Sequence, residues 1–363
     1  MDQIGLALNN VRKKLQDREW YSVRHMLSYA NWAMFYILLG GREAGKSYSV
    51  TDFFCRQFKT KGIPFTWIRL TEAASRKLLQ NNAEKLVDPD LRRKYDLDLI
   101  TSGNNVYHVV RRSTPDREGK TRILEKKLFA RVYNLSTFYN DKGSIFDKDF
   151  LNDPNMRYNI AIDEFEREKG EKNTFDITYT LVNQLENLVR STKERTRIFF
   201  LGNTLEEASD ILCAFDFIPE EFGIYKLKKK RAVIEYIEPS DRYKQRRKGT
   251  IADILMPEAS TFTNKVDVDN SLVTKEPLIT PKCIIKFRKD KNYWFTMWND
   301  NVIAKYNGEK KRVIAMRPYL DEVFNVEKQD QVILLFDTRS LQFRNLITFK
   351  EFEQAIAQLK PRK

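Results

Sequence analysis

The sequence has few of the residues on which disulfide-rich, metal-stapled or fibrous folds depend. Its 363 residues include only two His and three widely spaced Cys, which are Cys55, Cys213 and Cys283. Because no two Cys have the spacing of zinc ligands, we expect neither a structural zinc site nor a disulfide framework. Glycine and proline are also scarce, at 13 and 11 residues, which excludes a fibrous or low-complexity chain.

Long apolar runs are missing as well. The longest extends from Ala33 to Leu39, far short of the roughly 20 residues that a membrane-spanning helix needs. The N-terminus contains Asp2, Asn9 and Asn10 where a signal peptide would be apolar. We therefore expect a soluble, intracellular protein with no membrane partner.

The chain does have enough apolar residues and enough length for a folded core. Its hydrophobic content is 42%, with 24 Phe, 16 Tyr and 5 Trp. The length favours two domains rather than one. Lys and Arg number 64 against 50 Asp and Glu, a net charge of +14. Such an excess favours a polyanionic partner, because cationic side chains release counterions when they meet phosphates, although charge alone leaves nucleic-acid binding open.

Strands and helices alternate through the first half of the sequence. Short runs of β-forming apolar residues predict strands at 34–39, 65–70, 158–162 and 198–201. Helical spacing predicts helices at 1–33, 47–61 and 178–191. An antiparallel hairpin is expected as an insertion at 104–134. This order predicts an α/β fold with a mostly parallel sheet and helices on both faces.

The sequence changes character in its second half. Strands are expected at 223–227 and 232–237, and the polar, basic stretch at 239–249 predicts a linker or exposed loop. Further short strands are predicted at 284–287, 293–298, 302–306 and 332–336, with a closing helix at 349–359. We therefore predict three regions: an α/β domain at 1–207, a linker and hairpin region at 208–248, and a smaller α+β domain at 249–363.

The strongest motif follows the first predicted strand. Residues 40–47, GGREAGKS, fit the pattern G-x-x-x-x-G-K-[ST] and stand between a buried strand and a helix. Glycines let backbone N–H groups surround a phosphate, Lys46 reaches the outer phosphates and Ser47 binds magnesium. The motif predicts a site for ATP and Mg²⁺ built from Gly40, Gly41, Arg42, Glu43, Ala44, Gly45, Lys46 and Ser47.

Two adjacent carboxylates end the predicted strand at 158–162. Open α/β sheets bind ligands at the carboxyl ends of their strands. Asp163 is predicted to hold magnesium through water, and Glu164 to orient and deprotonate the attacking water. The alternative is that the pair merely favours the start of the next helix. The motif at 40–47, which we call the phosphate loop, favours the first interpretation, a nucleotide hydrolase.

Polar residues near the next strand complete the candidate site. Asn203 is predicted to contact the γ-phosphate or the attacking water, with helix capping as an equal alternative. Arg190 is the first candidate, and Arg195 the second, for an arginine that reaches the γ-phosphate of a neighbouring subunit. Arg42 and Arg69 are further candidates for contact with nucleotide or with a neighbour.

The set and order of these motifs resemble a known family over about the first 240 residues. The motifs are GGREAGKS, WIRL at 67–70, the hairpin, IAIDEFE at 160–166 and FFLGNT at 199–204. They resemble those of viral genome-packaging ATPases related to large terminase subunits, most of all the packaging ATPase of phi-29-like phages. The resemblance implies a P-loop NTPase fold of the additional-strand (ASCE) type.

The resemblance also implies a function and roles for residues. It implies a homopentameric ring in the host cytoplasm, transiently at the portal vertex of a procapsid, that uses ATP to translocate double-stranded DNA, with a structural RNA as an open possibility. Lys46 and Ser47 would act in the nucleotide loop, and Asp163 and Glu164 as the magnesium and catalytic pair. By the same resemblance Asn203 would couple hydrolysis to motion and Arg190 would be the trans-acting finger.

For the second domain the resemblance implies a ribonuclease-H-like fold. A nuclease of that kind needs clustered carboxylates to hold two metals, and the available ones are Asp290, Asp300, Asp321, Glu322 and Asp337. Basic residues dominate the first predicted strand pair instead. We therefore predict a vestigial nuclease-like domain that binds nucleic acid or the portal without cleaving DNA.

Two basic runs, Lys226–Arg231 and Arg242–Lys248, are predicted to meet DNA phosphates, a portal or RNA without reading bases. The hairpin at 104–134 is expected either to line the channel of the ring or to be an ordinary solvated hairpin. Two other functions stay open: a helicase or recombination ATPase, and a nucleotide-regulated nucleic-acid-binding scaffold.

Overall fold

The structure, a computed structural model, describes residues 19–111, 122–135, 156–165, 177–189, 195–202, 209–219 and 221–255, and short pieces between 273 and 353. The chain divides into two compact units. The first comprises Met1–Leu205 and Pro219–Lys265, and the second Glu206–Ile218 and Val266–Lys363. Within the described residues, no helix has both the length and the apolar character needed to cross a bilayer.

A nine-stranded sheet runs through the first unit, in the order β3-β4-β5-β2-β6-β7-β1-β9-β8. Consecutive members from β5 to β9 are parallel neighbours: β5 (Ile123–Asn134), β2 (Phe65–Arg69), β6 (Tyr158–Asp163), β7 (Thr196–Gly202), β1 (Phe35–Leu39) and β9 (Ala232–Tyr236). The outer strands β3 (Leu99–Ser102), β4 (Asn105–Arg111) and β8 (Gly223–Leu227) pair antiparallel with their neighbours. The prediction of an α/β fold with a mostly parallel sheet is confirmed.

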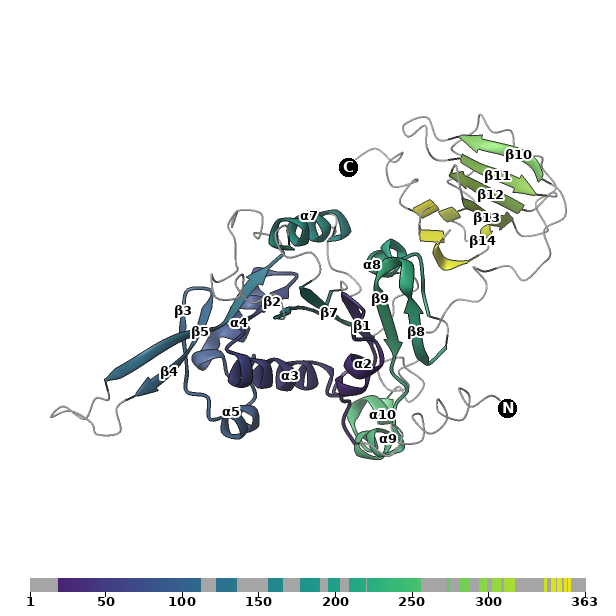
Figure 1. The fold of residues 1–363 in the computed structure, drawn as a ribbon. Helices are drawn as coiled ribbons and strands as arrows, with labels where there is room; N and C mark the ends of the chain where they lie inside the picture. The colour runs from purple at the N-terminus through teal and green to yellow at the C-terminus, as the bar shows by residue number, and fades with distance from the viewer. Residues whose placement is uncertain are drawn as a thin grey trace. The chain divides into compact units, whose positions relative to one another are not determined.

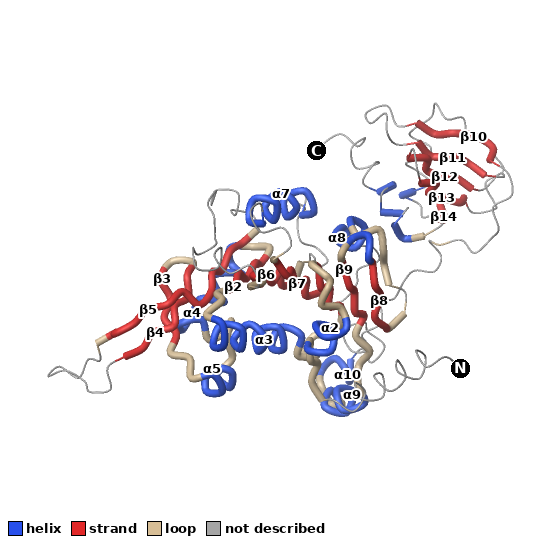
Figure 2. The backbone as a smooth tube through the Cα atoms, in the orientation of Figure 1, coloured by secondary structure: helices blue, strands red, loops and turns tan. Residues whose placement is uncertain are grey.

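The central strands are buried along most of their length because helices cover both faces of the sheet. Helix α3 (Lys46–Lys61) lies along one face and α7 (Ile177–Val189) on the opposite face, as Figures 1 and 2 show. Every residue of β6 is buried, which is the pattern of a strand in a doubly covered parallel sheet. In the core, the Phe54 ring of α3 contacts Phe65 and Phe199, at centroid distances of 4.8 and 5.4 Å.

Shorter helices complete the first unit: α2 (Arg24–Tyr29), α4 (Glu72–Ala83), α5 (Pro89–Tyr95), α9 (Asp241–Arg247) and α10 (Ile251–Leu255). Local sequence sets where two of them begin. Thr71 accepts a hydrogen bond from the Ala74 N–H at the start of α4, and Asp88 precedes Pro89, which opens α5. Of the helix predicted at 1–33, residues 1–18 lie outside the described part, and the remainder contains only α2.

The predicted hairpin is present, but it is not a simple insertion. Strands β4 and β5 pair antiparallel, and together they extend to one side of the sheet (Figure 1). The first half of β5 is exposed, whereas its last residues are mostly buried and pair parallel with β2. The first half of β5 therefore projects with β4 as an antiparallel pair, which we call the β4–β5 arm, and its second half belongs to the central sheet.

The segment 239–249 differs from the predicted linker or exposed loop, because most of it forms α9. The Ser240 hydroxyl accepts a hydrogen bond from the Tyr243 N–H at 3.1 Å and so caps the helix. Tyr243 and Arg247 are only 3% and 7% exposed. The polar composition suggested a solvated loop, whereas the structure packs a tyrosine and an arginine against the rest of the unit.

The second unit contains a five-stranded sheet whose neighbours follow chain order and are all antiparallel. Its strands are β10 (Pro281–Lys286), β11 (Trp294–Trp298), β12 (Val302–Asn307), β13 (Lys310–Met316) and β14 (Leu341–Phe343), and it also contains α8 (Asp210–Ala214). The first three were predicted, and β13 and β14 were missed. Positions 332–335 lie outside the described residues. The ribonuclease-H-like assignment stays a prediction.

Candidate nucleotide-binding site

The loop at 40–45 joins β1 to α3, as the motif predicted, and its backbone conformation demands a glycine. Gly45 has φ +91°, and a Cβ there would lie 3.3 Å from a ring carbon of Trp20. Any other residue would be strained at this φ and would press on the indole. Glu43 also has a positive φ, +62°, a conformation that costs a non-glycine residue roughly 1–2 kcal/mol. The loop is therefore a strained turn held by its surroundings.

Lys46 is folded back onto the loop that precedes it. Its Nζ donates hydrogen bonds to the carbonyls of Gly40 and Gly41, at 2.7 and 2.8 Å, and the residue is 5% exposed. The ammonium group thus lies within the turn that the motif assigns to the phosphates.

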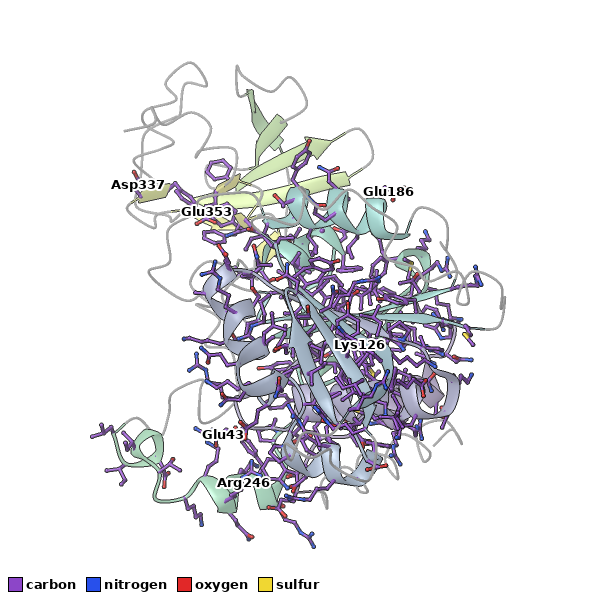
Figure 3. All side chains as sticks on the ribbon, turned by 90° about the vertical axis from the view of Figure 1, so that its left-hand side faces the viewer. Glu43, Lys126, Glu186, Arg246, Asp337 and Glu353 are labelled. Carbon is purple, nitrogen blue, oxygen red and sulfur yellow. The ribbon has the colours of Figure 1, made fainter. Side chains whose placement is uncertain are left out.

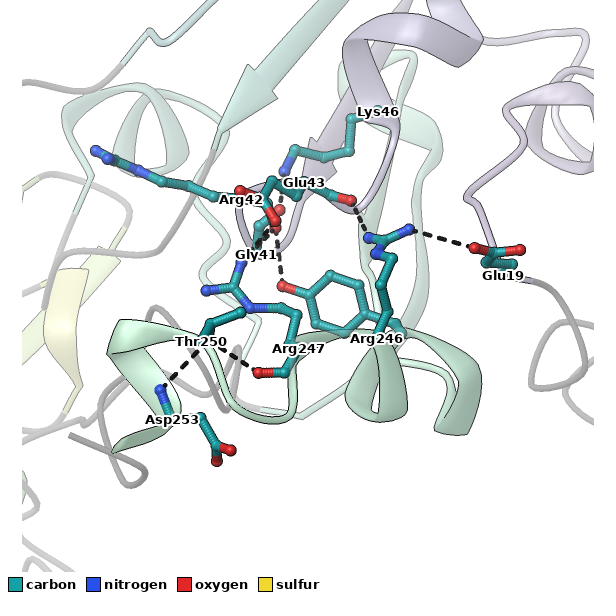
Figure 4. A network of polar contacts seen from close by, with 10 residues as sticks. Glu19, Gly41, Arg42, Glu43, Lys46, Arg246, Arg247, Thr250 and Asp253 are labelled. Atoms are coloured by element: carbon teal, nitrogen blue, oxygen red, sulfur yellow. Dashed lines mark hydrogen bonds and ion pairs between the residues drawn. The ribbon is translucent and has the colours of Figure 1, made fainter. Parts of the chain in front are cut away.

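The remaining carbonyls of the loop also accept hydrogen bonds. Those of Arg42 and Glu43 are bound by side chains of α9 (Figure 4). That of Ala44 is bound by the N–H of Tyr21 at 2.9 Å. The carbonyls of residues 40–44 therefore all accept hydrogen bonds, those of Gly40 and Gly41 from Lys46 and the other three from outside the motif.

Sheet topology brings the carboxylates to this loop. Strand β7 lies between β1 and β6, so Asp163, the last residue of β6, reaches the start of α3. The Ser47 hydroxyl donates to Asp163 Oδ1 at 3.3 Å. Burial raises the pKa of Asp163, although the nearby cations Arg69 and Lys46 oppose the shift.

Arg69, at the end of β2, bridges the two predicted catalytic carboxylates. Its Nη1 lies 2.6 Å from Asp163 Oδ2 and its Nη2 lies 2.7 Å from Glu164 Oε2. The Asp163 side chain is 11% exposed and that of Glu164 is 49% exposed. The sequence offered Arg69 as a contact for nucleotide or a neighbour, which stays a prediction, and the structure adds its pairing with two carboxylates of its own chain. The signal for this was its place at the carboxyl end of a strand, but the sequence does not reveal that β2 adjoins β6.

Glu164 also has an unusual backbone. Its φ is +52°, and its N–H donates to the Leu201 carbonyl of β7 at 2.9 Å. Two non-glycine residues of the candidate site, Glu43 and Glu164, therefore adopt left-handed conformations. Strain of this kind persists where surrounding contacts over-determine the backbone, often at functional sites.

Of the other predicted site residues, the structure describes Arg195, whereas Arg190 and Asn203 lie outside the described residues. The carbonyl of Arg195 accepts a hydrogen bond from the N–H of Tyr158, the first residue of β6, at 2.6 Å. Asp163 is the last residue of the same strand, so Arg195 lies at the opposite edge of the sheet from the phosphate loop.

The donor set at the loop fits magnesium. Ser47 and Asp163 present a hydroxyl and a carboxylate oxygen 3.3 Å apart, and Mg²⁺ prefers one or two such oxygen ligands together with waters and substrate phosphates. In the part of the chain that the structure describes, no group of three or more His, Cys, Asp or Glu could hold a metal ion. A magnesium ion here would therefore rely on the nucleotide and water for its other ligands.

Comparison with solved structures shows which known proteins share this fold. No protein-family model and no curated protein matches the sequence. A structure of the bacteriophage Phi-29 viral genome packaging motor assembly is similar with a TM-score of 0.59 and 18% identity, over 94% of this chain and 100% of that one. The Phi-28 gp11 DNA packaging motor gives 0.57 and 13%, over 95% and 99%. The predicted resemblance to phage packaging ATPases is confirmed in the fold, which is a P-loop fold.

Proposed function

We propose that this protein is an ATPase that drives the packaging of double-stranded phage DNA into a procapsid. The observation that carries the proposal is the contact between Ser47 and Asp163, which joins the phosphate loop to the carboxylate pair inside a fold shared with phage packaging motors. That likeness favours packaging over a helicase or a binding scaffold.

The proposed ATP site uses the loop as its phosphate cradle. The N–H groups of residues 41–46 would bind the phosphates, with Lys46 exchanging its two carbonyl contacts for the outer phosphate oxygens. Ser47 and Asp163 would hold Mg²⁺, which when bound offsets the phosphate charge. The strand β7 between β1 and β6 supports the additional-strand type of P-loop fold.

Glu164 is the proposed general base. Glu164 directly follows β6, and a carboxylate at that position can accept a proton from the attacking water. One oxygen of Glu164 is bound by Arg69. We propose that this ion pair opens before Glu164 accepts the proton of the attacking water. We propose that Asn203 contacts the γ-phosphate or the water, and that Arg190 of a neighbouring subunit completes the site.

The assembly in this proposal is a homopentameric ring in the host cytoplasm that docks at the portal vertex, with or without a structural RNA. The β4–β5 arm and the exposed basic turn at Lys228–Lys230 are the surfaces proposed for DNA. The second unit, a vestigial nuclease-like domain in this proposal, would bind nucleic acid or the portal without cleaving DNA.

ATP hydrolysis by the full chain tests the function. It should be measured alone and with procapsids, in the presence of double-stranded DNA, single-stranded DNA or RNA. Stimulation by double-stranded DNA, and its loss in Lys46→Ala and Glu164→Gln, is the expected result. Glu164→Gln should still bind ATP, since it changes only the base, and so separates catalysis from binding. A preference for single strands would indicate a helicase instead.

A further inference from the structure

One face of helix α9 is directed at the phosphate loop. Tyr243, Arg246 and Arg247 occupy positions i, i+3 and i+4, which share one side of a helix. Arg242 and Lys244, on the other side, are exposed. The basic run that the sequence assigned to DNA or another anionic partner is thus divided between two faces, one of which is occupied by the chain itself.

Each of the three side chains binds the loop's backbone or its strained residue. Tyr243 Oη donates to the Arg42 carbonyl at 2.8 Å, and Arg246 Nη2 donates to the Glu43 carbonyl at 2.7 Å. Arg247 Nη1 lies 3.4 Å from both the Arg42 carbonyl and Glu43 Oε2. Figures 3 and 4 show Glu43 and Arg246 side by side, and Figure 4 shows Arg247 beneath the loop.

Arg247 is buried and Arg246 is partly buried, with 25% of its side chain exposed, which argues against a purely structural helix. Arg247 is 7% exposed, and the Arg246 guanidinium stacks on Trp20 at 3.6 Å from the ring centroid and lies 3.9 Å from Glu19. Taking guanidinium groups out of water is unfavourable, and well-packed apolar residues often serve stability equally well. Arginines at such positions contribute directed donors that an apolar contact lacks.

Those donors act on the one loop residue whose conformation is strained. Glu43 has φ +62°, and α9 holds both its carbonyl and its carboxylate. Without these hydrogen bonds, the peptide would be free to relax toward an ordinary conformation and to turn its carbonyl. A carbonyl turned inward would face the phosphates and repel them.

The sheet carries α9 to this place. Strand β9 pairs in parallel with β1, and directly after β9 the Ile237 N–H donates to the Leu39 carbonyl at 2.8 Å. The chain that leaves β9 therefore starts beside the residue from which the loop leaves β1. A short connection then brings α9 under the loop.

We propose that Tyr243, Arg246 and Arg247 are positioning residues, which hold the carbonyls of Arg42 and Glu43 outward so that the loop keeps a phosphate-binding shape before nucleotide arrives. The inference rests on the proposed ATP site and adds a second element, distant in sequence, that sets the affinity of that site. Removal of these side chains weakens nucleotide binding, whereas hydrolysis at saturating ATP changes less.

The test is the dissociation constant of a fluorescent N-methylanthraniloyl derivative of ATP, titrated with Mg²⁺ into the full chain. Arg246→Ala removes one charge-assisted hydrogen bond to the loop and should weaken binding about tenfold. Lys244→Ala is the matched control on the exposed face of α9 and should bind as the unaltered protein does. Equal affinity of Arg246→Ala and Lys244→Ala would overturn the proposal.

A second-site change separates positioning from general support of the fold. Glycine adopts positive φ without strain, so Glu43→Gly should restore most of the affinity that Arg246→Ala removes. A helix that merely stabilised the unit would not be rescued in this way. Failure of rescue, with the thermal unfolding midpoint lowered in Arg246→Ala, would also overturn the proposal.

The outcomes also distinguish this inference from the proposed function. Binding by the unaltered protein that is lost in Lys46→Ala, but unchanged in Arg246→Ala, would leave an ATP site and refute the role of α9. Absence of binding by the unaltered protein would refute both.

Discussion

Two basic segments of the first unit have similar compositions and opposite environments. The turn at Lys228–Lys230 is exposed at each position, whereas α9 directs Arg246 and Arg247 onto the chain's own phosphate loop. The difference arises from spacing: α9 places its arginines on the face that also carries buried Tyr243. A run of cations therefore indicates an anionic partner only where the backbone leaves the charges outside.

Charge reversal at Arg247 is the severest test of this contrast. Arg247 Nη1 now lies 3.4 Å from Glu43 Oε2. Arg247→Glu would bury a carboxylate near that of Glu43, and an unpaired buried charge of this kind costs about 3–5 kcal/mol. Denaturant unfolding of the full chain should show a large loss of stability, together with loss of nucleotide binding. If Arg247→Glu unfolds like the unaltered protein but binds DNA less well, Arg247 contacts DNA rather than the loop.

The exposed segment should respond in the opposite manner. Simultaneous replacement of Lys228, Lys229 and Lys230 by Glu is expected to leave the unfolding midpoint unchanged and to weaken binding of double-stranded DNA by at least about tenfold. The log–log slope of affinity against salt should become shallower by roughly 0.9 for each phosphate that the turn no longer neutralises. An unchanged slope, measured by titration at several salt concentrations, would show that the turn does not touch DNA.

Two tyrosine-to-phenylalanine changes make a finer comparison. Tyr243→Phe removes the hydroxyl that donates to the Arg42 carbonyl, and should lower the free energy of unfolding by about 1 kcal/mol. Tyr225→Phe removes an exposed hydrogen bond to the Glu221 carbonyl and should change it by less than about 0.5 kcal/mol. Equal effects would mean that the loop contact contributes no more than a surface bond.

The smallest effect is expected on the outer face of α9. Lys244 forms an exposed pair with Asp241 at 3.6 Å, so Lys244→Glu should alter the free energy of unfolding by less than about 0.5 kcal/mol. Its effect on DNA binding is informative even so. If Lys244→Glu weakens DNA binding as much as the changes at 228–230 do, the exposed face of α9 also contacts DNA. One face of α9 would then bind DNA and the other the phosphate loop.

Local sequence was sufficient to predict the centre of the fold. The strand, loop and helix around residues 34–61 were predicted closely because a continuous apolar run, a glycine-rich turn and an amphipathic stretch follow one another. The carboxylates of Asp163 and Glu164 were found for the same reason, as they end a buried strand. Their roles in catalysis, and those of Arg190 and Asn203, stay predictions.

Contacts between distant segments could not be predicted in the same way. Arg69 pairs with Asp163 and Glu164 only because β2 adjoins β6, and strand order is not written in any single stretch of sequence. The helix α9 was missed because its inward face is polar, so that it lacks the apolar periodicity by which helices are found. The basic composition of 239–249 therefore suggested a solvent-exposed loop, whereas Tyr243 and Arg247 are buried.

The pairing of β9 with β1 has a practical consequence for anyone who divides this protein. A fragment that ends at 207, the boundary suggested by the sequence, lacks β8, β9 and α9. Strand β1 would become the edge of the sheet, and its apolar residues and open row of hydrogen-bonding groups would be available to another copy. Aggregation of such a fragment would indicate that the exposed β1 edge pairs between copies, and we expect a soluble fragment of the first unit to require residues beyond Arg247.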